Sequence, residues 1–174
     1  MPRLFRHCVE PDQPTKMAPE KQAASVPLVY RIYMLWLEPI FAVIGAYLYI
    51  FTPTDALQII TPPPLHPQTL QQTPIEKLLM WEVASLYVYF AFIEFVVLRY
   101  VGSERRDIWR LVVAGILLCD MGHLWSLKLV TDASGQPSAL WDPRMWTRWE
   151  DWGNQFTTWF GFLLRISFIL GVGF

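Results

Sequence analysis

The stretch LVVAGILLCDMGHLWSLKLV, residues 111–130, decides how the rest of the chain is interpreted. It is apolar and long enough for an α-helix to cross a bilayer. Its middle, however, holds Asp120 and His123. An acid at the centre of a membrane-spanning helix costs about 2.5–3.5 kcal/mol on insertion scales, so it normally faces other protein groups or a water-filled cavity. Because Asp120 and His123 are three positions apart, they share one face of a helix.

Three further apolar blocks resemble this one. The chain has 174 residues, of which 53% are hydrophobic and 17% charged, and the hydrophobic residues gather in four long blocks. We expect membrane spans at about 28–51, 75–98, 108–130 and 152–174. The predicted fold class is therefore all-α, an integral membrane four-helix bundle over residues 27–174. Residues 1–26 are polar and proline-rich, which predicts a disordered cytosolic tail.

The distribution of charge indicates orientation and excludes one class of partner. Nine lysines and arginines fall in the tail, at the entry of the first span and around the loop between spans two and three, against four on the other side. This bias predicts that both termini are cytosolic. No targeting signal appears, so the endoplasmic reticulum is the default membrane. A net charge of −1 gives no basic field for nucleic acid, and Cys8 and Cys119 form no CxxC spacing.

The first predicted span carries a cation and an acid. Arg31 lies near its entry, and Glu38 lies about two turns farther on. Both can therefore face the interior of the bundle. Pro39 follows Glu38 and releases a backbone carbonyl one turn earlier, which needs a partner or water. A Glu-Pro pair inside a span is typical of a pocket wall.

The second and fourth spans add further ionisable groups. Glu82 and Glu94 lie about 120° apart around a helix, so they cannot both face the same direction, whereas Tyr87 can share a face with Glu94. In the last span Asn154 and Arg165 belong to one polar or small stripe, and Arg165 is the natural counter-charge for a buried acid. By depth along their helices, Glu38, Glu94, Asp120 and Arg165 are expected to meet in the cytosolic half of the membrane or at its midplane.

The connections between spans carry weaker signals. Residues 52–74 are rich in Pro, Thr and Gln and predict an extended loop, although a short helix or a lid over a substrate remains open. His66 in this loop is expected to be solvated. The tryptophans within 131–152 are typical of an interfacial aromatic belt.

These residues predict an acid–base site. Two carboxyl groups in different surroundings can be divided into a proton donor and an ionised partner. Such a pair can protonate an epoxide oxygen or an alkene on a lipophilic substrate, and aromatic rings suit a cationic intermediate. The predicted catalytic residues are Glu38, Glu94, Asp120, His123 and Arg165. The predicted substrate pocket adds Arg31, Glu82, Tyr87, Trp125 and Asn154.

Other interpretations of the same residues stay open. The charged groups could only pin helices together, although interhelical polar contacts average about 0.6 kcal/mol. A metal site from Asp120, His123 and a glutamate is conceivable, but its spacing is generic, and we predict no metal. No phosphate-cradling glycine loop, dinucleotide fingerprint or Ser/His/Asp motif occurs, so no cofactor is predicted.

Several strings carry a resemblance over about residues 28–174. YRIYMLWLEP, WEVASLYVYFAFIEFVVLR, CDMGHLWSL, DWGN and the late GVG resemble a family of small fungal four-span membrane proteins. Some proteins of this kind are linked to gene clusters for polyene pyrones of the aurovertin and citreoviridin type, where an epoxide-opening hydrolase or cyclase is assigned. More distantly, Glu38, Glu94 and Asp120 resemble the acids of the sterol-isomerase and sigma-2-receptor superfamily. Integral membrane meroterpenoid cyclases are usually longer and have more spans, so the chain departs from them.

The resemblance implies an enzyme of fungal secondary metabolism that opens epoxides on a lipophilic polyketide or isoprenoid. In this scheme Asp120 or Glu38 is the acid, Glu94 the base and Arg165 the electrostatic partner. The alternatives are an alkene isomerase or a protonation-initiated terpene cyclase, and a non-enzymatic protein that binds sterols or lipids or acts as a scaffold. The expected partners are a lipophilic small molecule, the lipid bilayer and, for a scaffold, partner biosynthetic enzymes.

Overall fold

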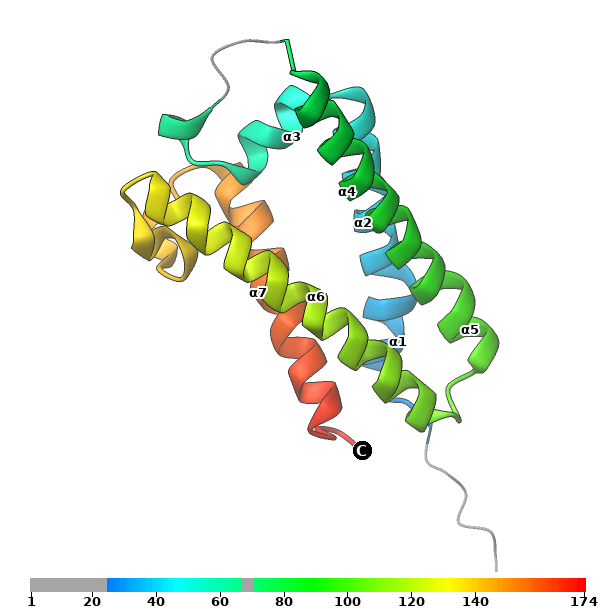
Figure 1. The fold of residues 1–174 in the computed structure, drawn as a ribbon. Helices are drawn as coiled ribbons and strands as arrows, with labels where there is room; N and C mark the ends of the chain where they lie inside the picture. Colours follow the sequence, from blue (N-terminus) through cyan, green and yellow to red (C-terminus); the bar gives the residue numbers. More distant parts are fainter. Residues whose placement is uncertain (1–24, 67–70) are drawn as a thin grey trace, which may run out of the picture.

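A computed structural model describes residues 25–66 and 71–174, and within them every regular element is helical (Figure 1). The predicted all-α class is confirmed. Apart from residues 25 and 26, the predicted tail lies outside the described residues, as do residues 67–70.

The first two long helices each contain one turn of π-helix. The first runs through α1 (Leu28–Ile32), the π segment η1 (Tyr33–Leu37) and α2 (Glu38–Phe51) without a break. The second runs likewise through α4 (Pro74–Phe92), the π segment η3 (Ile93–Val97) and α5 (Leu98–Val101). A capping box begins the second helix, because the Thr73 hydroxyl accepts the Glu76 N–H at 3.2 Å and the Glu76 carboxylate accepts the Thr73 N–H at 2.7 Å.

The last two long helices differ in how closely they follow the predicted spans. Helix α6 (Arg106–Ala133) contains the predicted third span and extends beyond both of its ends. Helix α7 (Trp149–Ile169) begins and ends earlier than residues 152–174. Its early start follows from Asp151, whose carboxylate accepts the Arg148 N–H at 3.1 Å and so caps the first turn. Its early end follows from Gly171 and Gly173, whose φ angles of +79° and +85° are left-handed and break a helix.

In the part of the chain that the structure describes, three helical stretches have the length and apolar composition of membrane spans. They are Leu28–Phe51, Pro74–Val101 and Arg106–Ala133, with mean hydropathies of 1.7, 1.6 and 1.4. These three candidate spans coincide with the first three predicted spans and, by length and composition, indicate a multi-pass integral membrane protein. Helix α7 is not among them, so the fourth predicted span does not follow from hydropathy.

The connector between the first two spans is more regular than predicted. We expected an extended loop over residues 52–74, but the structure has helix α3 (Pro53–Ile60) and a 3-10 turn η2 (Pro63–Leu65) there. The extended-loop prediction is therefore wrong for α3. Pro53 suits the first turn and Asp55 is favourable beside the N-terminal dipole, so local signals outweighed the loop-like composition. The 3-10 turns η4 (Pro137–Leu140) and η5 (Pro143–Met145) lie between α6 and α7.

The long helices form two pairs that meet at one end of the molecule. Helix α2 packs chiefly against α4, and α6 packs against α7. The pairs converge where α1, the α5–α6 loop and the C-terminus lie, and they diverge toward α3 (Figure 1). The main buried cluster lies at the convergent end, and comprises Val26, Tyr30, Tyr33, Met34, Leu35, Leu98, Trp109, Val113 and Phe168. Hydrogen bonds from Val26 N–H to Ser103 O and from Tyr30 Oη to Val172 O close this end.

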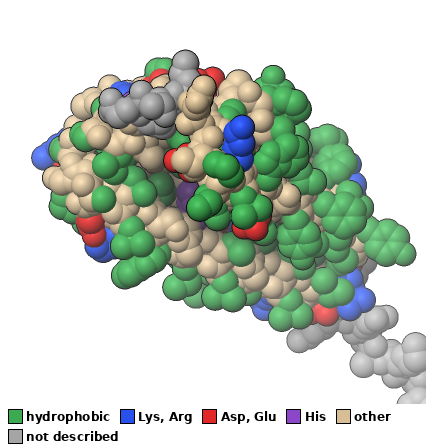
Figure 2. Space-filling model, turned by 45° about the horizontal axis from the view of Figure 1, so that its top comes forward, with side chains coloured by type: hydrophobic (Ala, Val, Ile, Leu, Met, Phe, Trp, Pro, Cys, Tyr) green, Lys and Arg blue, Asp and Glu red, His purple; other side chains and the backbone are tan. Residues whose placement is uncertain are grey.

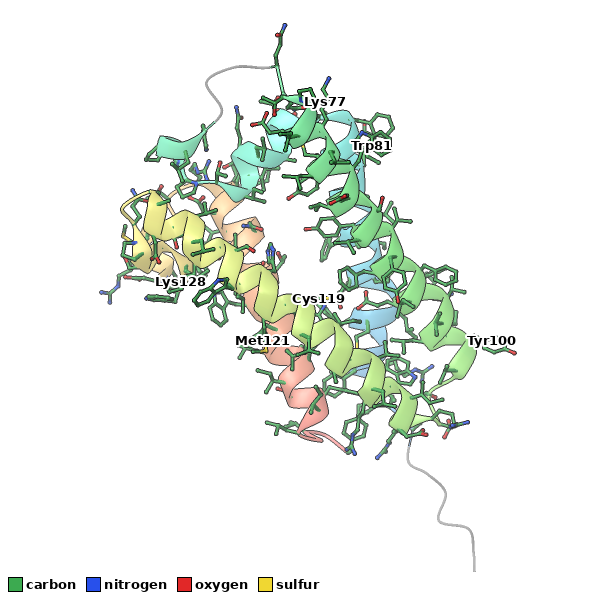
Figure 3. All side chains as sticks on the ribbon, viewed as in Figure 1. Lys77, Trp81, Tyr100, Cys119, Met121 and Lys128 are labelled. Carbon is green, nitrogen blue, oxygen red and sulfur yellow. The ribbon has the colours of Figure 1, made fainter. Side chains whose placement is uncertain are left out.

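Apolar side chains also cover the outer faces of the helices. Hydrophobic groups spread over the long flanks in Figure 2. Trp81, Tyr100 and Met121, for example, are 56%, 92% and 57% exposed and point away from the space between the pairs (Figure 3). A soluble protein rarely exposes so much apolar surface, whereas lipid solvates it. The outer faces therefore agree with the hydropathy of the spans.

Candidate functional site

A cavity of about 500 Å³ lies between the two helix pairs, and we call it the inner cavity. All four long helices contribute to its wall. Its ionisable members are Tyr33, Glu38, Tyr87, Glu94, Cys119, Asp120, His123 and Arg165. Its other members include Phe41, Gly45, Leu86, Phe90, Ile116, Asn154, Thr158 and Gly161. The five predicted catalytic residues thus share one cavity with the predicted pocket residues Tyr87 and Asn154.

Arg165 is the centre of the charged group. Its side chain is only 5% exposed, and its guanidinium pairs with Glu38 through Nη2 and with Asp120 through Nη1 at 2.5 Å. One cation on α7 therefore joins an acid on α2 to an acid on α6. This contact links the two helix pairs across the cavity, and it agrees with the sequence-based expectation that Arg165 neutralises a buried acid.

Glu94 lies in the same cavity but lacks any such partner. Glu94 is 1% exposed, and neither of its carboxyl oxygens has a hydrogen-bond partner among the described residues. A buried carboxylate without a counter-charge is far more costly than a neutral acid in the same place. The site therefore presents two kinds of carboxyl group, with Glu38 and Asp120 held by a cation and Glu94 held by none.

The two π segments hold the acids on α2 and η3. In η1 the Glu38 N–H donates to Tyr33 O, and in η3 the Leu98 N–H donates to Ile93 O, five residues back in each case. The two segments contact each other, so both irregular turns lie side by side on one flank of the cavity. Pro39 accounts for the first, because it has no N–H to give to the carbonyl of Leu35. Single π turns inside α-helices are frequent at functional sites.

Gly161 leaves room for the closest approach across the cavity. A Cβ atom at this position would lie 2.7 Å from the Tyr33 hydroxyl oxygen and 3.3 Å from Arg165 Nη1. Any larger residue would therefore push against both groups. The Tyr33 hydroxyl is thereby placed next to the charged cluster, and its ring packs edge-on against Phe160 at 5.3 Å between centroids.

The opposite wall of the cavity is aromatic. The Tyr87 ring lies 3.4 Å from where a Gly45 Cβ would be, and it stacks on Tyr49 at 5.8 Å between ring centroids. Phe41 and Phe90 line the cavity as well. Ring faces of this kind stabilise a positive charge that develops on a bound molecule.

Three predicted pocket residues lie outside the lining of the inner cavity. Glu82 is exposed on the outer face of α4, as the 120° offset from Glu94 implies. Trp125 is 61% exposed and lies near Lys128, whose Nζ is 6.0 Å from the ring centroid. Arg31 lies in the first turn of its helix, two turns from Glu38, and is half-buried outside the cavity lining. His66 is not simply solvated, because Nε2 contacts Thr61 O at 3.0 Å and Arg148 Nη1 at 3.1 Å.

Sequence reasoning did not select Tyr33 or the two π turns as parts of the site. For η1 a signal existed, since Pro39 inside a span requires an irregular backbone nearby. For η3 there was none, because residues 93–97 contain neither glycine nor proline. Tyr33 can be recognised as a site residue only from the structure, because the π turn pairs its carbonyl with the Glu38 N–H five residues later.

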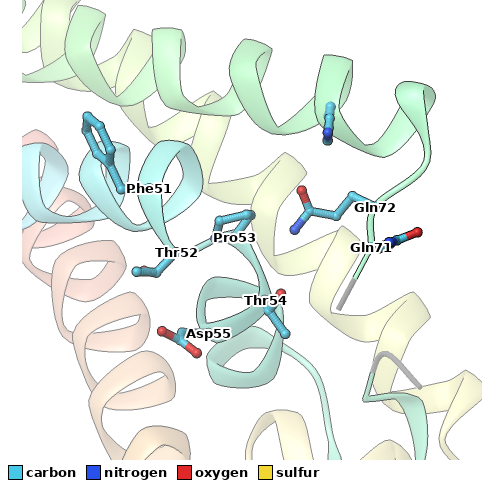
Figure 4. Close-up of a pocket in the computed structure, with 8 residues that line it drawn as sticks. Phe51, Thr52, Pro53, Thr54, Asp55, Gln71 and Gln72 are labelled. Atoms are coloured by element: carbon cyan, nitrogen blue, oxygen red, sulfur yellow. The ribbon is translucent and has the colours of Figure 1, made fainter. Parts of the chain in front are cut away.

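Two other cavities lie near the end where the helix pairs diverge. One of about 330 Å³, which we call the outer cavity, is lined by parts of α3, α6 and α7 and by the segment before α7. The other, about 630 Å³, is lined by the turn from Phe51 to Asp55 together with Gln71, Gln72 and Lys77 (Figure 4). Neither includes Glu38, Glu94, Asp120 or Arg165. Within the described residues, no group of three or more His, Cys, Asp or Glu side chains could hold a metal ion.

Comparison with known proteins identifies a family. The model of the domain of unknown function DUF7704 matches residues 23–174. The chain belongs to this family. Searches of the curated proteins and of the solved structures found no match. The DUF7704 match contains every residue of the inner cavity, so the acids, Arg165 and both π turns all lie in the family's domain.

Proposed function

We propose that the protein is a membrane-embedded acid–base enzyme that opens an epoxide on a lipophilic substrate. The observation that supports this most is the division of carboxyl groups in one cavity, with Glu94 unpartnered and Glu38 and Asp120 paired to Arg165. Epoxide opening needs one protein group that donates a proton to the epoxide oxygen. It needs a second protein group that accepts the proton lost by the attacking water or hydroxyl. A largely aromatic and aliphatic lining suits a lipophilic molecule.

The environments suggest a role for each acid. Glu94 donates its proton to the epoxide oxygen as the carbon–oxygen bond breaks. Water or a hydroxyl of the substrate attacks the carbon, and Asp120 or Glu38 accepts the proton that it loses. The product is a diol or a cyclic ether, and no electrons are gained or lost. This assignment is the reverse of the sequence-based one, because the unpaired acid is the better donor and the paired acids are the better acceptors.

Arg165 and the aromatic wall assist this reaction in the proposal. Arg165 keeps one acceptor ionised and fixes its position. The rings of Tyr87, Phe41 and Phe90 stabilise positive charge on the carbon under attack. The same donor and rings would serve protonation of an alkene, so isomerisation or cyclisation is the second candidate reaction.

The proposal includes a membrane arrangement and a biological setting. Helix α7 has 21 residues, about 31 Å at 1.5 Å per residue, which is long enough to act as a fourth span despite its polar stripe. Four spans would place both ends of the chain on one side, and the lysine and arginine bias makes that side cytosolic. We place the enzyme in the endoplasmic reticulum and in fungal secondary metabolism, on the resemblance to small proteins of polyene-pyrone clusters.

The test is turnover in water labelled with oxygen-18. The purified protein in lipid nanodiscs is incubated with lipophilic epoxides, and the product is analysed by mass spectrometry. We expect wild-type protein to give a labelled diol or an unlabelled cyclic ether, and Glu94→Gln to lose at least about 100-fold of the rate, as is typical of a general acid. Glu82→Gln is the matched control, because Glu82 is exposed on the outer face of the same helix.

Each result separates the candidates. An isomerised alkene without oxygen-18 supports the second candidate reaction. Saturable binding of the epoxide with no change in the ligand supports a binding protein. Equal turnover by wild type and Glu94→Gln contradicts the assigned donor.

A further inference from the structure

The outer cavity adjoins the inner cavity at one residue. Asn154, on the first turns of α7, lines both. The outer cavity extends from there toward α3 and the segment between α6 and α7, with Ile60, Met145 and Trp146 among its apolar walls. An elongated molecule that extends past Asn154 would therefore occupy both cavities at once.

Hydrogen bonds fix the walls of the outer cavity. The Arg148 guanidinium donates to Gln58 O at 3.0 Å and to Thr61 O at 3.1 Å, so the end of α3 is tied to the start of α7. The Trp146 indole N–H donates to Ala139 O at 2.7 Å, and the Trp159 indole N–H donates to Leu140 O at 2.8 Å. The cavity is therefore built by tertiary contacts.

One buried polar group in this wall has no partner. Gln155 is 8% exposed, and its Oε1 accepts no hydrogen bond. Leaving such an acceptor unsatisfied is unfavourable, and the described residues around it offer no donor to it. Gln155 itself lines the cavity, so a rotation of its side chain would bring this oxygen to a group that donates a hydrogen bond from inside the cavity.

Two charged groups in the wall neutralise each other, and a third faces solvent. Arg148 and Asp151 pair with each other, with Nε 3.1 Å from Oδ1. Thr131, also buried, already donates its hydroxyl hydrogen to Lys128 O at 2.9 Å. Arg144 lines the cavity but is exposed to solvent. A neutral hydroxyl, which donates one hydrogen bond and accepts others, matches this setting.

We propose that the outer cavity binds the hydroxyl end of an elongated amphiphile whose reactive part lies in the inner cavity. The substrate class is then a long, mostly apolar molecule with a terminal hydroxyl remote from the epoxide. The identity of the reactive group as an epoxide rests on the proposed function, but binding of the hydroxyl end does not depend on turnover. Gln155 is the residue that distinguishes the hydroxyl from a methyl group.

Photo-crosslinking in nanodiscs tests the binding directly. The probe is octadecan-1-ol that carries a diazirine beside the hydroxyl carbon, and competitors are octadecan-1-ol and octadecane. We expect adducts on residues 59–64 or 145–147, and competition by the alcohol at a concentration about three- to tenfold lower than by the alkane, the ratio that one buried hydrogen bond gives. Adducts confined to the outer, lipid-facing surfaces, or equal competition, would overturn the proposal.

Two variants keep the test specific. Gln155→Leu has nearly the same volume and should reduce the ratio to about one, while Gln155→Glu keeps an acceptor and should retain a preference for the alcohol. The matched control is Gln58→Leu, the same change at an exposed side chain that leaves its backbone carbonyl in place. An unchanged ratio in Gln155→Leu overturns the proposal.

The experiment also separates this inference from the proposed function. Glu94→Gln is expected to label normally while turnover is lost. If labelling is normal and depends on Gln155 but the protein opens no epoxide, the hydroxyl site is supported and only the proposed enzyme activity is contradicted. Turnover is also compared between cis-9,10-epoxyoctadecan-1-ol and cis-9,10-epoxyoctadecane. Equal turnover of the two would contradict the hydroxyl site and leave the proposed enzyme activity in place.

Discussion

At the scale of single residues, the site depends on one cation shared by two acids. Removing one partner of a buried ion pair costs more than removing the whole group, because the remaining charges lose their compensation. Arg165→Met would leave Glu38 and Asp120 buried and unpaired. We expect its free energy of unfolding in detergent to fall by about 3–5 kcal/mol. Adding Glu38→Gln and Asp120→Asn should restore most of the loss, and a triple variant as unstable as Arg165→Met would contradict the ion-pair account.

Gly161 provides a second prediction at this scale. Gly161→Ala places a Cβ 2.7 Å from the Tyr33 hydroxyl oxygen, so we expect a destabilisation of about 1–3 kcal/mol by overpacking. Tyr33→Phe removes that oxygen, and the next ring atom, Cζ, would be 3.7 Å away, which is ordinary contact. The double variant should therefore recover most of the loss in a thermal unfolding assay, and the 3.3 Å approach to Arg165 Nη1 accounts for what remains. Gly153→Ala, in the same helix with nothing within 4 Å, is the control and should gain up to about 1 kcal/mol from helix propensity.

At the scale of elements, the two π turns set the directions of the acids. Pro39→Ala supplies the missing N–H and allows the first helix to relax toward regular α bonding, which would rotate Tyr33 relative to Glu38. We expect the variant to insert normally and to lose about tenfold in turnover, roughly the effect of a small misplacement of catalytic groups. Pro53→Ala, at the start of α3 outside the spans, is the control. Full activity in Pro39→Ala would show that the π turn does not position the site.

The elements also show which features could be predicted from the sequence. Asp120, Glu38 and Arg165 could be identified because a charged side chain inside an apolar span is costly in lipid. Such a side chain is therefore expected to face the protein interior. Glu82 was misplaced because the sequence fixes only angles around one helix, and not which face meets a neighbour. Helix α3 was predicted only as an alternative to an extended loop, because the proline and threonine content of residues 52–74 resembles a loop. The π turn at η3 and the pairing of Tyr33 with Gly161 depend on contacts between helices and leave no trace in local composition.

At the scale of the whole molecule, the two helix pairs meet at one end (Figure 1), and the inner cavity lies between them. If α7 crosses the membrane, both described ends lie on one side. We test this with single-cysteine variants of a protein without Cys8 and Cys119. A membrane-impermeant maleimide should label Ser25→Cys and Val172→Cys from the same side, and Arg144→Cys from the opposite side. Labelling of Val172→Cys and Arg144→Cys from the same side would leave three spans.

The central claim is that the acids of the inner cavity perform chemistry. The most direct measurement is the metabolite profile of a deletion strain of the source organism beside strains that carry Glu94→Gln or the exposed control Glu82→Gln. The account predicts that the deletion and Glu94→Gln accumulate the same epoxide-bearing lipophilic precursor, while Glu82→Gln matches the wild type. If Glu94→Gln also matches the wild type while the deletion does not, the cavity is not catalytic and the account is wrong.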